Sequence, residues 1–289
     1  MLAILLGCRQ RDRAGRARSE SPRPAAVPAP ALPRFTEHAT AADALKVVLA
    51  EKPRVLGFGE YHAMVGAPRV ASAIERFTGM LDLLAPYLSD LVVETWIAQG
   101  KCGKAEAKVF RDVPRDTARP PDTPNELVRL ATRARALGVQ PHALTLSCRD
   151  YESLVGKDGA KDASVDYEKM LSLITRELLR VSSAAVKKRN AKQGSRPVVA
   201  IYGGALHNDL YPYDATKAWS YATQLAARVP GYVEVDLYVP ELVQDRGLLA
   251  LEPWYPLLGL APPDRVLLIE RAPRSYILLL QKGLAPARP

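Results

Sequence analysis

The stretch R-V-L-G-F-G-E-Y-H, from Arg54 to His62, predicts the arrangement of the rest of the chain. Its apolar start is typical of a buried strand, and Gly57 and Gly59 allow the backbone to bend or to approach another group closely. Glu60 and His62 follow where the strand ends. Open α/β sheets bind ligands at the C-terminal edge of their strands, so we expect both side chains in a ligand-binding crevice.

A second stretch repeats this arrangement later in the chain. The sequence P-V-V-A-I-Y-G-G-A-L-H-N-D, from Pro197 to Asp209, again has an apolar strand, a glycine pair and then a histidine, His207. Half of the four histidines therefore follow a strand end directly after glycines. Because parallel strands end at one edge of a sheet, we expect His207 to lie near Glu60 and His62.

The remaining segments alternate between helix-like and strand-like patterns. Helices are expected over residues 40–51, 67–88, 123–138, a long segment from 164, and 215–228. Strands are expected over residues 90–95, 139–147, 198–202, 232–238, and as a pair within 266–280. Residues 97–122 are expected to form an irregular excursion. The order predicts an α/β fold, with a largely parallel sheet flanked by helices and an antiparallel hairpin at the C-terminal edge.

The N-terminal region divides into two short segments before the main domain. Residues 1–8, M-L-A-I-L-L-G-C, resemble a truncated lipoprotein signal in which Cys8 would be acylated; the alternative is an apolar N-terminus without this role. Residues 9–34 are rich in Arg, Pro and Ala, which predicts an extended, disordered tether. Residues 35–289 are then expected to form a single α/β domain.

The net charge of +9 belongs largely to the tether. Residues 9–34 carry seven arginines against Asp12 and Glu20, a balance of +5, which leaves +4 for residues 35–289. Such a tether suits an anionic membrane surface. The chain has no interleaving of basic and aromatic residues of the kind that stacks bases, so we expect no nucleic-acid partner.

The cysteines suggest an oxidising compartment. With Cys8 acylated, Cys102 and Cys148 remain as an even pair that could form a disulfide in a cell envelope. The alternative is two unpaired thiols.

Glu94 adds a second carboxylate to the predicted crevice. It lies among apolar residues in D-L-V-V-E-T, where a carboxylate needs a partner; the alternative is a strand-end side chain that faces solvent. With Glu60, His62 and His207, it gives a plausible ligand set for a divalent metal. Without a metal, the same groups could perform acid–base catalysis, with a histidine as base and a glutamate to orient it. A third interpretation gives the histidines no joint function.

These motifs resemble those of a known superfamily. The G-E-x-H turn with Glu60 and His62, Glu94 at the end of the next strand, and His207 in I-Y-G-G-A-L-H-N-D are similar to ChaN-like haem-binding lipoproteins, Tiki/TraB metalloproteases and erythromycin esterases. The resemblance extends over about residues 40–240. It implies that these four residues line the active or ligand site.

The ChaN-like branch fits best, because its members are lipoproteins, as Cys8 suggests. The resemblance implies haem or a divalent metal as cofactor, with His62, His207 and Tyr61 near haem. Four tyrosines lie near the motifs and are candidates for the haem-binding tyrosine: Tyr61, Tyr202, Tyr211 and Tyr213.

The resulting expectation is an envelope lipoprotein, periplasmic or at the cell surface, that is anchored to the membrane through Cys8. Its Glu/His site would bind haem or a divalent metal together with a small-molecule or peptide ligand. The alternative is a metal-dependent or His/Glu hydrolase, an esterase or protease, that uses the same four residues.

Overall fold

The computed structural model of this chain describes residues 32–155, 164–191, 196–243 and 247–286. Cys8 and residues 9–31 of the predicted tether lie outside these ranges, so the lipid anchor stays a prediction. Within the described ranges, no helix is both long and apolar enough to span a bilayer.

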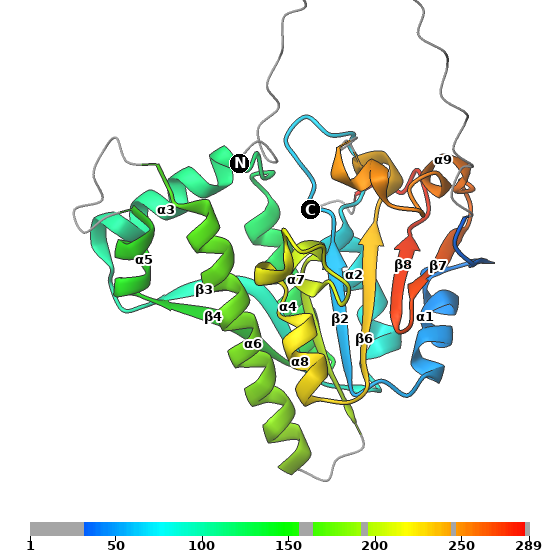
Figure 1. The fold of residues 1–289 in the computed structure, drawn as a ribbon, viewed down its shortest axis with the longest axis horizontal. Helices are drawn as coiled ribbons and strands as arrows, with labels where there is room; N and C mark the ends of the chain where they lie inside the picture. The colour runs from blue at the N-terminus through cyan, green and yellow to red at the C-terminus, as the bar shows by residue number, and fades with distance from the viewer. Residues whose placement is uncertain (1–31, 156–163, 192–195, 244–246, 287–289) are drawn as a thin grey trace, which may run out of the picture.

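An eight-stranded mixed sheet forms the centre of the fold, with spatial order β1-β7-β8-β6-β2-β5-β3-β4 (Figure 1). Its strands are β1 (Phe35–His38), β2 (Val55–Glu60), β3 (Leu88–Gln99), β4 (Gln140–Ser147), β5 (Val198–Gly204), β6 (Tyr232–Tyr238), β7 (Val266–Ala272) and β8 (Ser275–Leu279). The neighbours β8-β6-β2-β5-β3-β4 pair in parallel, whereas β1 with β7 and β7 with β8 are antiparallel. The predicted α/β fold, with its C-terminal antiparallel hairpin, is confirmed.

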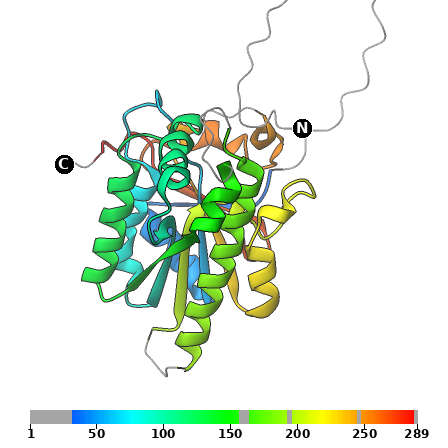
Figure 2. The ribbon, with the colours of Figure 1, turned by 90° about the vertical axis from the view of Figure 1, so that its left-hand side faces the viewer.

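Helices cover both faces of the sheet (Figure 2). One face packs against α1 (Ala41–Ala50), α2 (Ala73–Leu84) and α4 (Thr123–Ala136). The other packs against α3 (Gly103–Asp116), α5 (Cys148–Val155), α6 (Tyr167–Ala191) and α8 (Ala222–Arg228). Shorter helical segments are α7 (Ala205–Asn208), α9 (Leu257–Leu260) and the 3-10 turns Lys217–Trp219, Pro240–Leu242 and Leu248–Leu251. The central strands β2, β5 and β6 are therefore buried on both faces.

The glycines of β2 provide space for a close neighbour. Neither Gly57 nor Gly59 has a positive φ, so no turn requires them. A Cβ on Gly57 would lie 1.9 Å from Oδ1 of Asn208 and 2.0 Å from the hydroxyl of Tyr232. A Cβ on Gly59 would lie 2.7 Å from Cα of Ala205. The two glycines thus let α7 lie directly on the central strand.

Two predicted segments differ from the structure. Residues 97–122 are not an irregular excursion, because β3 continues to Gln99 and α3 follows at Gly103–Asp116. The buried face of α3 combines Val109 and Val113 with the charged residues Lys108 and Asp112, and Pro114 lies inside the helix. The helix predicted over residues 215–228 is a 3-10 turn followed by the shorter α8.

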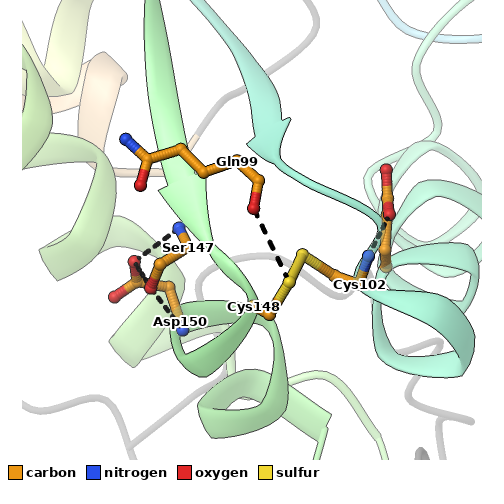
Figure 3. Close-up of a disulfide and its surroundings, with 6 residues drawn as sticks. Gln99, Cys102, Ser147, Cys148 and Asp150 are labelled. Atoms are coloured by element: carbon orange, nitrogen blue, oxygen red, sulfur yellow. Dashed lines mark hydrogen bonds between the residues drawn. A yellow bond between two sulfur atoms is a disulfide. The ribbon is translucent and has the colours of Figure 1, made fainter.

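A disulfide joins Cys102, before α3, to Cys148, at the start of α5 (Figure 3). The structure therefore contains the pair that the even cysteine count suggested. The two residues are 46 positions apart, and closing a loop of that length stabilises the fold by about 3–4 kcal/mol in the chain-entropy account. The bond fixes the start of α3 beside the ends of β3 and β4.

The tight contact at Gly57 predicts a large difference between two glycine substitutions. Gly57→Ala should lower the free energy of unfolding by about 1–3 kcal/mol or more, because the methyl group would overlap Asn208 and Tyr232. Gly79→Ala is the control: Gly79 lies on the exposed side of α2 with nothing within 4 Å of a built Cβ. It should be neutral or stabilise by up to about 1 kcal/mol. Urea unfolding of both variants checks this; equal stability would contradict the packing argument.

Candidate functional site

Glu60 and His62 form a hydrogen-bonded pair at the C-terminal end of β2. Nδ1 of His62 lies 2.7 Å from Oε1 of Glu60, and the hydroxyl of Tyr202 donates to Oε2 at 2.6 Å. Nη1 of Arg119 lies 3.6 Å from Oε1. The Glu60 side chain is 6% exposed and that of His62 is 32% exposed. The imidazole is therefore the part of the pair that a ligand can reach.

The surroundings of Glu60 favour its ionised form. Burial alone would raise the pKa of this carboxyl, but its polar neighbours outweigh that effect. The charge and hydrogen bond of His62 lower the pKa, and Arg119 and the Tyr202 hydroxyl lower it further. The net pKa lies below the ordinary value, so Glu60 is a carboxylate at neutral pH.

The hydrogen bond of this pair fixes the tautomer of His62. A carboxylate has no proton to give, so the shared hydrogen must be carried by Nδ1 of the imidazole. In the neutral ring the lone pair is then on Nε2. His62 therefore presents a base at Nε2 while Glu60 holds the other side of the ring.

Glu94 and His207 form a second, more buried pair. Oε2 of Glu94 accepts a hydrogen bond from the backbone N–H of Gly204 at 2.8 Å, and Oε1 lies 3.9 Å from Nε2 of His207. Nδ1 of His207 donates to the carbonyl oxygen of Trp219 at 2.8 Å and lies 3.0 Å from the hydroxyl oxygen of Thr175. The neutral His207 ring therefore also has its lone pair on Nε2, which lies 3.9 Å from Oε1 of Glu94.

The glycine pair of β5 brings these two pairs together. A Cβ on Gly204 would lie 2.8 Å from Nε2 of His62 and 3.7 Å from Oε2 of Glu94. A Cβ on Gly203 would lie 2.4 Å from Oε2 of Glu94. Because successive residues of a strand face opposite sides, His62 approaches the end of β5 from one side and Glu94 mainly from the other. All four predicted site residues thus gather at one edge of the sheet.

The arrangement is not a ready-made metal site. Among the described residues, no three His, Cys, Asp or Glu side chains are grouped so that they could hold a metal ion. His62 and His207 each have Nδ1 in a hydrogen bond, and the two oxygens of Glu60 are occupied by His62 and Tyr202. Binding of haem or of a divalent metal by Glu60, His62, Glu94 and His207 stays a prediction, and we derive no chemical step through either cofactor.

The four candidate tyrosines occupy different surroundings. Tyr202 contacts the site directly through Glu60. Tyr61 stacks on Tyr238, with 6.1 Å between the ring centroids, at the edge of an apolar cluster. Tyr211 and Tyr213 hydrogen-bond elsewhere, to the carbonyl oxygen of Pro273 and to Glu252. The structure therefore links Tyr202 directly to the predicted site.

A buried acidic cluster beside α7 did not follow from the sequence. Glu234 and Asp236 are 0% and 3% exposed, because both faces of β6 are covered. Nδ2 of Asn208 donates to Oδ1 of Asp236 at 3.2 Å. Nη1 of Arg271 donates to Asp209 at 2.8 Å and to Glu234 at 3.3 Å. The alternation of Y-V-E-V-D-L-Y is equally compatible with acidic residues that face water, so periodicity could not reveal this cluster.

The titration of this cluster depends on burial. Burial raises the pKa of Asp236 to about 7, against the opposing effect of Arg271. Burial and the neighbouring charge of Asp236 raise the pKa of Glu234 well above its ordinary value. The cluster therefore holds protons that the same residues would release in the unfolded chain.

Two further site residues were missed or only partly anticipated. Arg119 lies in the segment expected to be irregular, and no pattern there indicated contact with Glu60. Tyr202 precedes the glycine pair of β5, but its position alone did not indicate a bond to Glu60. The alternation of side chains along β2 and β5 is the signal that could have placed Tyr202 and Glu60 on one face of the sheet. Phe58 pairs with Tyr202, and Glu60, two residues after Phe58, faces the same side.

Comparisons with known proteins give little further information. No protein-family model matches the chain, and no curated protein matches it. Among solved structures, the chain is similar to the type III effector HopBA1, with a TM-score of 0.40 and 14% identity over 73% of this chain and 88% of that one. We draw no inference from a similarity of this extent. The resemblance to the ChaN-like, Tiki/TraB and erythromycin-esterase superfamily stays a prediction.

Asp236 predicts how stability varies with pH. Its ordinary pKa is 3.8 and its folded pKa is about 7, so between these values the folded chain keeps a proton that the unfolded chain has lost. The free energy of unfolding should therefore fall as pH rises from about 4 to about 7. Asp236→Asn should flatten this dependence and stabilise the protein at pH about 8. Urea unfolding at a series of pH values measures this dependence of the free energy of unfolding. The control is Asp264→Asn, at an exposed position in a loop. An unchanged slope in Asp236→Asn would contradict the assignment.

Proposed function

We propose that this protein is a hydrolase in which His62, oriented by Glu60, acts as general base on a water molecule. The observation that carries the proposal is the 2.7 Å contact between Nδ1 of His62 and Oε1 of Glu60, in a ring that is partly exposed. This is the arrangement of base and orienting carboxylate found in hydrolytic dyads and triads. Its substrate would be an ester or a related acyl compound.

The proposed step needs no group beyond water and the substrate. The water oxygen bonds to the carbonyl carbon while its proton moves to Nε2 of His62. The electron pair of the C=O bond moves onto the carbonyl oxygen. As that pair returns, the bond to the leaving oxygen breaks, and His62 gives its proton to that oxygen. The products are an acid and an alcohol, and Glu60 stabilises the imidazolium that forms between the two proton transfers.

Glu94 and His207 would have a positioning role. Glu94 holds the backbone N–H of Gly204, the residue against which Nε2 of His62 rests. His207 is 3% exposed and contacts Glu94 from within the fold. Loss of either side chain would therefore shift the end of β5 and the water beside His62.

The disulfide supports the location that accompanies this proposal. Disulfides persist in oxidising compartments and are rare in the cytosol, so the bond between Cys102 and Cys148 fits a protein of the cell envelope. A lipid anchor at Cys8 remains part of the same proposal.

The chain provides a matched control for testing the dyad. His142 forms an equally short contact, with Nε2 2.7 Å from Oδ1 of Asp90, near the starts of β4 and β3 and so at the opposite edge of the sheet. His62→Ala should lower kcat/KM for a p-nitrophenyl ester by roughly 10²–10⁴-fold, the usual contribution of a general base. His142→Ala should leave kcat/KM unchanged, because that pair lies far from the site. Stopped assays with a series of p-nitrophenyl esters measure both variants.

Two further results would change the conclusion. Equal hydrolysis by wild-type protein and His62→Ala would contradict the proposed base. A stoichiometric metal in the purified protein, with activity that EDTA abolishes and the metal restores, would replace this mechanism by metal-dependent hydrolysis. A Soret band after addition of haemin that depends on His62 or His207 would instead favour the haem-binding alternative.

A further inference from the structure

Arg119 lies within salt-bridge distance of the predicted site, and its guanidinium makes little use of its hydrogen-bond donors. Its side chain is 25% exposed, and Nη1 lies 3.6 Å from Oε1 of Glu60. That separation is longer than a hydrogen bond. Both oxygens of Glu60 already accept hydrogen bonds from His62 and Tyr202. Within the described ranges, the guanidinium therefore has a charge partner but donates no hydrogen bond to it.

The fold holds this guanidinium in place. The backbone N–H of Arg119 donates to the carbonyl oxygen of Pro114 at 2.9 Å, closing the end of α3. The carbonyl oxygen of the preceding Ala118 accepts from the N–H of Val65 at 2.7 Å. Ala118 has φ 49°, a left-handed conformation that is unfavourable for alanine. The backbone is thus strained and bonded at the position that directs Arg119 toward Glu60.

The start of the same helix is fixed as well. Cys102 precedes α3 and is bonded to Cys148, so α3 is held at one end by the disulfide and at the other by the contact with Val65. A side chain held by this arrangement, beside the partly exposed imidazole of His62, is well suited to bind a ligand. An arginine fork pairs with a carboxylate or a phosphate through two parallel hydrogen bonds.

We infer that Arg119 is a specificity-determining residue that binds an anionic group of the substrate, a carboxylate or a phosphate, while His62 acts on the neighbouring acyl bond. This inference rests on the proposed function and narrows it to substrates that carry a negative charge. The anion would supply the hydrogen-bond acceptors that the guanidinium lacks. Glu60 competes for the same charge, so its presence weakens anion binding while it orients His62.

Two probes of equal chain length test the inference by kinetics. The mono-p-nitrophenyl ester of glutarate has an anionic end, and p-nitrophenyl valerate has a neutral one. The ratio of kcat/KM for glutarate over valerate should fall roughly tenfold or more in Arg119→Ala, as expected for loss of a charge-assisted bidentate contact. The ratio for Arg119→Lys should lie between those of wild-type protein and Arg119→Ala, because lysine keeps the charge but lacks the guanidinium fork. Any effect of the Arg119 substitution on Glu60 itself changes kcat/KM for both esters and therefore cancels in their ratio.

Arg133→Ala is the matched control. Arg133 pairs with Asp82 and lies in the last turn of α4, away from the C-terminal edge of the strands. Arg133→Ala removes the same net charge as Arg119→Ala and should leave the ratio of kcat/KM for the two esters unchanged. An unchanged ratio in Arg119→Ala, or an equal fall in Arg133→Ala, would overturn the inference.

Calorimetric titration with glutarate separates this inference from the proposed function. Wild-type protein should bind glutarate, Arg119→Ala should lose most of that affinity, and Glu60→Gln should bind more tightly because the competing charge is gone. If no ester is hydrolysed, the proposed function fails and these titrations alone decide the anion site. Absence of glutarate binding, or binding that is insensitive to Arg119, would overturn it.

Discussion

The site depends on the close contact between α7 and the central strand β2. Gly57 and Gly59 leave no side chain on the face of β2 where Asn208 and Ala205 lie, and any Cβ there would overlap them. Because α7 directly follows β5, this contact also determines the position of His207. The residues that look like a flexible turn in the sequence are therefore required for close packing, which is a rigid constraint.

The glycine pair at the end of β5 extends the same constraint to the edge of the sheet that carries the four candidate site residues. Glu94 occupies the space beside Gly203, and His62 occupies the space beside Gly204. The two pairs, which come from three separate segments of the chain, therefore meet at this edge. Each imidazole is oriented through Nδ1 by an oxygen acceptor, Glu60 in one case and the Trp219 carbonyl in the other. The arrangement leaves the His62 side chain partly exposed and keeps His207 inside the fold.

Much of this architecture follows from sequence patterns, and the reasons for the exceptions are physical. The strand before Glu60 and the strand before Gly203 are short apolar runs, and parallel packing puts their ends together. The helix that ends before Arg119 carries two charged residues, Lys108 and Asp112, on its buried face and has an internal proline, so its apolar residues alone did not reveal it. The contacts of Arg119 with Glu60 and of Arg271 with Glu234 link residues far apart in the chain. Long-range contacts of this kind leave no local pattern in a single sequence.

The tautomer of His62 is the central point of this account, and nitrogen NMR measures it directly. Long-range ¹H–¹⁵N spectra at mildly alkaline pH, with His62→Ala used to assign the signals, distinguish a protonated ring nitrogen from an unprotonated one. We expect His62 to carry its hydrogen on Nδ1 and a lone pair on Nε2, and Glu60→Gln to disturb this preference. A neutral His62 with its hydrogen on Nε2 would contradict the proposed base and its orientation by Glu60.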